Sequence, residues 1–181
     1  LVEPVDELLM QSLMDYEGKK LKSIGKGTIN LGDAEEREKT QKDLKQKEEE
    51  TSGLLALLQK SVDEHVKQVR LSSRLISSPA CLVGTEMDYS PQLEKLLMKG
   101  KGGGPKQRRI LELNPNHQIF TKLQERFNQN SEDSAINDYA ELVLGYALLA
   151  EGSELSDPVK FNRLLTDLML PDGSGLAVVE S

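Results

Sequence analysis

The chain has 181 residues, 37% hydrophobic and 29% charged, so it can bury a core of its own and forms one or two domains. Its 23 Lys and Arg residues against 30 Asp and Glu give a formal charge of −7, which argues against nucleic-acid binding, because that function needs clustered positive charge. The single cysteine, Cys81, excludes an internal disulfide or a cysteine-based zinc site and fits a reducing, cytoplasmic location. No apolar run is long enough to span a membrane.

The first third of the chain predicts two helices. Asp6 can cap a helix over residues 6–16, and residues 19–31, interrupted by glycines, predict a short irregular strand or loop. Residues 33–50 then carry 13 charged side chains of alternating sign, typical of a solvated helix face, and lead into an apolar stripe. Together these patterns predict one long helix from about residue 34 to 66. The start at Leu1, without an initiator methionine, indicates a fragment of a longer protein.

Three short apolar runs, at residues 68–72, 80–83 and 110–113, have strand length and are bounded by Ser, Pro, Gly or Asn. They predict a three-stranded sheet. Residues 87–99 between the second and third runs have helical periodicity, and the glycine cluster that follows at 100–104 predicts a flexible linker.

Three further helices are predicted after the sheet, at residues 118–128, 134–150 and 158–170. The fold class is therefore α+β: a small three-stranded sheet packed with a long helix and followed by a C-terminal helical hairpin. The two hairpin helices carry more apolar surface than they can cover between themselves, which favours a homodimer built as a four-helix bundle. The alternative is that the hairpin covers the chain's own sheet.

No residue pattern indicates catalysis. Residues 25–28 resemble part of a phosphate loop, but Gly27 separates Lys26 from Thr28 and breaks the required spacing. Cys81 lies in a strand-like apolar run, where a free cysteine is usually a packing residue, and the two histidines have no metal-ligand spacing. We expect no catalytic residue, bound cofactor or metal; an enzyme would need a concave site that unites Cys81, a histidine and a carboxylate.

The amphipathic segment 87–99 suggests a binding surface. Its apolar residues recur at helical spacing, and the glycine-rich neighbour would leave it loosely tethered, which suits binding to partly unfolded protein. The alternative is that the helix packs on the sheet. The candidate client-binding residues are Tyr89, Leu93, Leu96, Leu97 and Met98.

Several motifs, in order along the chain, resemble the C-terminal region of the ninety-kilodalton heat-shock chaperone family. Residues 72–83 (SSRLISSPACLV) and 110–117 (ILELNPNH) carry the strongest resemblance, and residues 3–21 resemble the end of that family's middle domain. The segment LLAEG at 148–152, followed by Asp-Pro at 157–158, is similar to the bacterial, HtpG-like branch.

The resemblance implies an ATP-dependent chaperone of the stress response, with its ATP and Mg²⁺ site in an N-terminal domain outside this chain. It implies the end of a middle domain at residues 1–32, a dimerisation domain at 33–171 and a flexible tail at 172–181. Implied partners are a second copy and partly unfolded clients; the chain's last residues lack the acidic motif that docks helical-repeat co-chaperones. The alternative is a homodimeric scaffold without a client role. The implied dimer-interface residues are Tyr139, Leu142, Val143, Tyr146, Leu149, Phe161, Leu164, Leu165 and Leu168.

Overall fold

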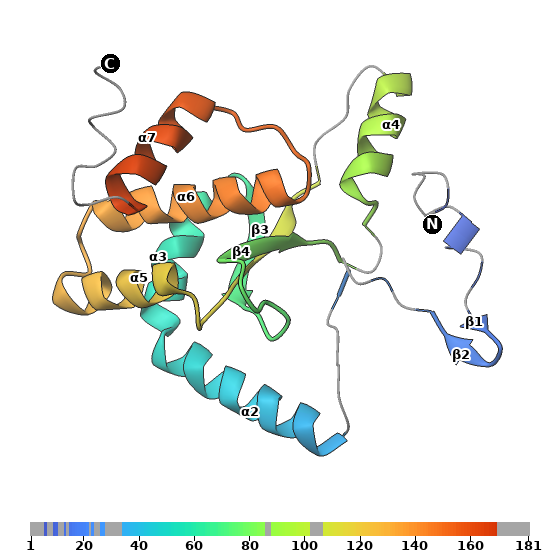
Figure 1. Cartoon of the computed structure of the whole chain (residues 1–181), viewed down its shortest axis with the longest axis horizontal. Coiled ribbons are helices and arrows are strands. Elements are labelled where there is room, and N and C mark those ends of the chain that lie inside the picture. The colour runs from blue at the N-terminus through green and yellow to red at the C-terminus, as the bar shows by residue number, and fades with distance from the viewer. Residues whose placement is uncertain are drawn as a thin grey trace.

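The structure, a computed structural model, describes residues 6, 9–10, 13, 15–21, 23, 26–27, 34–85, 88–101 and 107–169. The fold is α+β, as predicted from the sequence (Figure 1). In chain order, the elements are β1 (Asp15–Tyr16), β2 (Lys19–Lys20), α2 (Ala34–Glu50), α3 (Ser52–Val62), β3 (Val66–Leu71), β4 (Ala80–Val83), α4 (Pro91–Lys101), β5 (Arg109–Leu113), α5 (Gln118–Gln129), α6 (Ala135–Ala150) and α7 (Pro158–Met169).

The predicted three-stranded sheet is present and is mixed. Its strand order is β3-β5-β4, with β3 parallel and β4 antiparallel to the central strand β5. Leu111 of β5 pairs with Val69 on one side and with Leu82 on the other. All five residues of β5 are buried, which is expected for a strand that has a neighbour on each edge.

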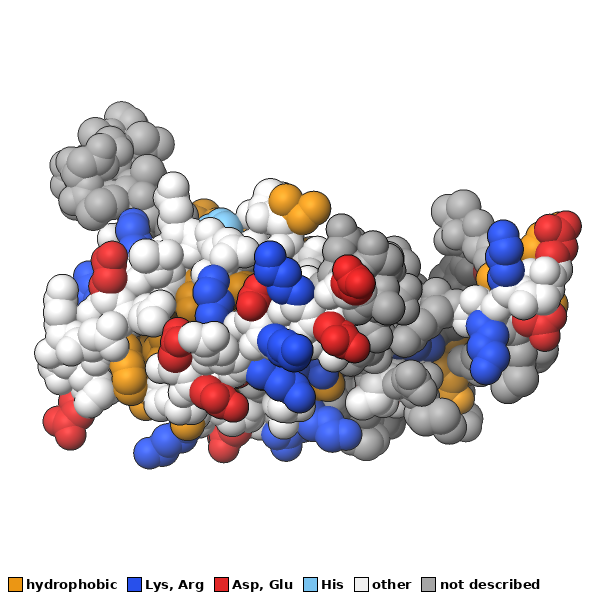
Figure 2. All heavy atoms as spheres, turned by 90° about the horizontal axis from the view of Figure 1, so that it is seen from below, with side chains coloured by type: hydrophobic (Ala, Val, Ile, Leu, Met, Phe, Trp, Pro, Cys, Tyr) orange, Lys and Arg blue, Asp and Glu red, His pale blue; other side chains and the backbone are white. Residues whose placement is uncertain are grey.

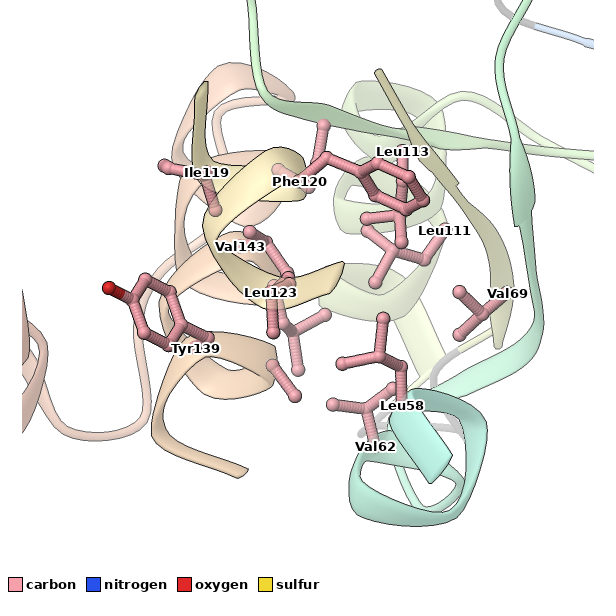
Figure 3. Close-up of a cluster of buried hydrophobic side chains, with 14 of the residues drawn as sticks. Leu58, Val62, Val69, Leu111, Leu113, Ile119, Phe120, Leu123, Tyr139 and Val143 are labelled. Atoms are coloured by element: carbon pink, nitrogen blue, oxygen red, sulfur yellow. The ribbon is translucent and has the colours of Figure 1, made fainter. Parts of the chain in front are cut away.

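Helices α3, α5 and α6 build the core against this sheet (Figures 1 and 3). Leu58 and Val62 of α3 meet Leu111 and Leu113 of β5 in the buried cluster, where α5 contributes Leu123. Figure 3 also shows Tyr139 of α6 at the border of this cluster, with its hydroxyl pointing away from it. The apolar faces of three helices thus close one side of the sheet.

Side chains from α2 and α3 cap the outer edge of β3. The backbone N–H of Val69 donates to Oε1 of Gln59 at 2.7 Å, and that of Leu71 donates to Oε1 of Glu48 at 3.0 Å. These bonds satisfy edge donors that would otherwise be free to pair with another strand. The rest of α2 is largely exposed, and Figure 2, which views the molecule from the side on which α2 lies, shows basic and acidic side chains interspersed.

The single helix predicted over 34–66 is two helices. The break lies at Thr51, which is buried and whose hydroxyl donates to the carbonyl of Lys47 at 2.6 Å. Next to the break, a Cβ on Gly53 would lie 3.0 Å from the Phe127 ring, so the glycine permits close approach of α3 to α5. The second helix ends at Val62, and a turn at residues 63–65 leads into β3.

The helix predicted over 6–16 is also shorter than expected. Asp6, Leu9 and Met10 are helical, but Asp15–Tyr16 pairs with Lys19–Lys20 as an antiparallel hairpin. Glu17 and Gly18 both have positive φ, the conformation that a tight two-residue hairpin turn requires. Most of the predicted linker at 100–104 and the tail at 172–181 lie outside the described residues.

A buried carboxylate organises the other face of the sheet. Glu112 of β5 accepts hydrogen bonds from Arg70 at 2.6 Å and from the Ser72 hydroxyl at 2.9 Å, and it pairs with Arg74 at 2.9 Å. Arg74 also donates to the carbonyl of Gly27 at 2.6 Å. Glu112 thus connects the sheet, the loop after β3 and the segment that precedes α2.

We predict that Glu112→Gln lowers the free energy of unfolding by about 3 kcal/mol, the low end for breaking a buried ion pair, because Arg70 keeps some contact with water. Urea unfolding at fixed protein concentration measures the change. Asp133→Asn is the control, since its ion pair with Arg126 is exposed to solvent and should matter far less. Equal effects of the two substitutions would contradict the prediction.

Candidate interaction surfaces

Helix α4 displays part of the apolar face predicted from the sequence. Leu96 is 54% exposed, Leu97 40% and Tyr89, just before the helix, 37%. Leu93 is fully buried, so the expectation that it shares the exposed face is wrong. The side chain of Met98 lies outside the described residues.

Polar contacts fix the first turns of α4. Glu94 accepts a hydrogen bond from Arg109 of β5 at 2.6 Å and another from the backbone N–H of Gln107 at 2.7 Å. Lys95 donates to the carbonyl of Gly152, at the end of α6, at 2.6 Å. The helix is therefore attached at its base, while Figure 1 shows it standing apart from α3, α5 and α6.

The helical hairpin of α6 and α7 has a close contact at its centre. A Cβ on Gly145 would lie only 2.4 Å from the Phe161 ring, so this glycine lets α7 approach α6. The Phe161 ring also meets that of Tyr146 edge-on, with centroids 5.6 Å apart, and Lys160 forms an ion pair with Glu141. The Asp157 carboxylate caps α7 by accepting from the Lys160 N–H at 2.8 Å.

The structure corrects part of the predicted dimer interface. Tyr139, Leu142 and Val143 are at most 2% exposed, because this face of α6 is buried inside the chain's own fold. They can add almost no area to a contact with a second copy. For this face, the alternative that the hairpin covers the chain's own sheet is the correct one.

The remaining interface candidates keep some accessible surface. Leu149 is 49% exposed, Tyr146, Phe161 and Leu165 are half-buried, and Leu164 is buried against α6. The side chain of Leu168 lies outside the described residues. Sequence analysis missed Val159, which is 80% exposed in the first turn of α7; it is outside the apolar stripe, so periodicity gave no signal for it.

A groove of about 340 Å³ runs between α3, α6 and α7. Its apolar lining includes Leu148, Leu155 and Phe161, and its polar lining includes His65 and Lys160. The groove leaves the hairpin incompletely sealed on this side.

The structure places Cys81 beside Glu112 and the two histidines in other surroundings. Burial and the neighbouring Glu112 raise the pKa of the Cys81 thiol to about 11, which disfavours the reactive thiolate at neutral pH. His117 caps α5, where its Nδ1 accepts from the Ile119 N–H at 3.1 Å, and His65 lines the groove. Among the described residues no cluster of three metal-ligating side chains occurs.

Comparison with known proteins shows the family of the chain. A model of the family described as "Hsp90 protein" matches residues 1–175. The chain belongs to the Hsp90 family. It is 42% identical over 167 residues to the chaperone protein HtpG of Frankia casuarinae, covering 92% of this chain and 26% of that protein. It is 38% identical over 179 residues to HtpG of Geobacter metallireducens, covering 98% of this chain and 27% of that protein.

This Hsp90-family chain therefore spans roughly a quarter of the length of the curated relatives it matches. The relatives bear the name of a chaperone. In the part of the chain that the structure describes, no helix has both the length and the hydrophobicity for a membrane span.

Proposed function

We propose that this chain is the C-terminal dimerisation and client-contact part of an ATP-dependent chaperone of the HtpG type, acting in the cytoplasm on partly unfolded proteins. Residues 1–32 would end the middle domain, residues 33–171 would form the dimerisation domain and residues 172–181 a tail. The observation that carries the proposal is the apolar surface left open on α7 and on the outer side of α6. The order of motifs along the sequence supports the same assignment.

The open surface on α6 and α7 favours a second copy as its cover. Val159 and Leu149 are exposed, and Phe161 and Leu165 are only half-buried, although α7 packs on α6. Burying one such side chain contributes about 1.5 to 3 kcal/mol. Several from each protomer of a two-fold dimer would outweigh an association cost of about 4 to 15 kcal/mol.

We predict that Leu165→Asp converts the dimer to a monomer, because it would place an unpaired carboxylate in the interface. Light scattering at low micromolar concentration measures the mass. Asn162→Asp, which adds the same charge at an exposed position of α7, should remain dimeric. A monomeric unmodified chain, or a dimeric Leu165→Asp variant, would refute the assignment of the interface.

The exposed residues of α4 support client contact. Leu96 and Leu97 on α4, and Tyr89 just before it, are exposed apolar side chains, and charged side chains hold the base of the helix. Exposed apolar groups of this kind suit recognition of non-native protein, which itself exposes apolar side chains. The competing function is a scaffold without a client role, which would not explain why these apolar side chains are exposed.

We predict that Leu96→Ser combined with Leu97→Ser weakens suppression of a client's aggregation by the full-length chaperone. The melting temperature should change little, because both side chains are already exposed in the folded chain. Ile76→Ser, at a 94% exposed position on the loop after β3, is the matched control. Unchanged suppression by the double variant would favour the scaffold function.

The assignment to the C-terminal region competes with assignment to a nucleotide-binding region of the same family. The motifs at residues 72–83 and 110–117, which resemble the C-terminal region of the family, favour the C-terminal assignment. We predict that the isolated chain neither binds nor hydrolyses ATP, which calorimetric titration with Mg-ATP and a phosphate-release assay would measure. Micromolar affinity would transfer the chain to the nucleotide-binding region.

A further inference from the structure

One guanidinium lies between two carboxylates from different helices. Arg109, the first residue of β5, pairs with Glu94 of α4 at 2.6 Å and with Glu151, the C-cap residue of α6, at 3.6 Å. All three side chains are more than nine-tenths buried. Arg109 also donates to the carbonyl of Tyr89 at 3.3 Å, so it contacts the segment that leads into α4 as well.

The end of α6 is shaped to face α4. Gly152 has a φ of +77°, and the N–H groups of Gly152 and Ser153 donate to the carbonyls of Leu149 and Leu148, which is the hydrogen-bond pattern of a glycine-terminated helix. This turn directs the Gly152 carbonyl to Lys95 at 2.6 Å. The Ser153 hydroxyl holds the other oxygen of Glu151 at 2.6 Å.

The charge balance of the cluster makes its geometry sensitive to Arg109. Two buried carboxylates share one cation, and Oε2 of Glu151 is buried without a hydrogen-bond partner. Without the guanidinium, both carboxylates would be unpaired in a dry environment, which is strongly unfavourable. α4 would then be released toward water, because the only fully buried apolar side chain described on it is Leu93.

We infer that Arg109 is a positioning residue: it fixes α4 against the end of α6 and so couples the client-contact surface to the dimerisation hairpin. This inference rests on the proposed client function. A change at the end of α6 on dimerisation would reach α4 through Glu151, Gly152 and Arg109, and a client bound to α4 would act on the hairpin by the same route. Coupling of this kind is reciprocal.

The direct test measures the position of α4 in the full-length chaperone by electron spin resonance. Spin labels at Gln92→Cys on α4 and Glu125→Cys on α5, both exposed, report one distance in a Cys81→Ala background. Labelled protomers are diluted with unlabelled ones. We expect Arg109→Met to shift or broaden the distance distribution and Arg108→Met to leave it unchanged, because within the described residues Arg108 donates to the carbonyl of Val66 and not to α4 or α6.

A second variant separates positioning from folding. Glu94→Gln, Arg109→Met and Glu151→Gln together leave no buried charge unpaired, so this variant should fold while its distance distribution still differs from that of the parent. To suppress client aggregation equally, this variant should be needed at a concentration at least about fivefold higher than the parent. Fivefold is the lower end of the usual coupling between two sites. The inference is overturned if the distance distribution of this variant equals that of the parent, or if the variant does not fold.

The outcome is distinguishable from failure of the proposed function. If Leu96→Ser with Leu97→Ser leaves client suppression intact, client contact by α4 is refuted, whereas the distance measurement still reports whether Arg109 holds the helix. If that double variant weakens suppression but the neutral triple variant shifts α4 without weakening it, the coupling is refuted and client contact stands.

Discussion

The fold depends on keeping two charged residues buried in its central strand. Arg109 and Glu112 lie in β5, where every residue is buried, and a buried charge is tolerated only when it is paired. Because side chains alternate across a strand, Arg109 shares its face with Leu111 and Leu113 of the hydrophobic cluster, whereas Glu112 lies on the opposite face. Each charge therefore gathers partners on a different side of the sheet.

The charge clusters around Glu112 and Arg109 connect different parts of the fold. Glu112 gathers Arg70, Arg74 and Ser72 from β3 and the following loop, and through Arg74 reaches Gly27 in the segment that precedes α2. This cluster organises the sheet and its connection to the preceding part of the chain. Arg109 gathers carboxylates from α4 and from the end of α6, so it joins the two elements for which we propose contact with clients and with a second copy.

The helical layer shows how one helix serves the core and a surface. The inner residues of α6 are buried against α3 and the sheet, while Gly145 and Tyr146 receive Phe161 of α7. α7 packs on α6 from outside this layer and carries exposed apolar surface, with Val159 80% exposed. The apolar residues around most of α6 are thus covered within one chain, by the core on one side and by α7 on the other. The proposed second copy would cover α7.

The sequence alone determined the α+β class, the three strands and the helices after them, because apolar periodicity and glycine or proline boundaries are local signals. Its motifs also indicated the Hsp90 family. Only the tertiary structure decided that the predicted long helix breaks at Thr51, that Leu93 is buried while Leu96 is exposed, and that Tyr139 faces the chain's own core. Periodicity identifies an apolar face but carries no information about which surface meets it. Likewise, the pairing of Arg109 with Glu94 and Glu151 joins residues far apart in sequence, so only folding brings these charges together.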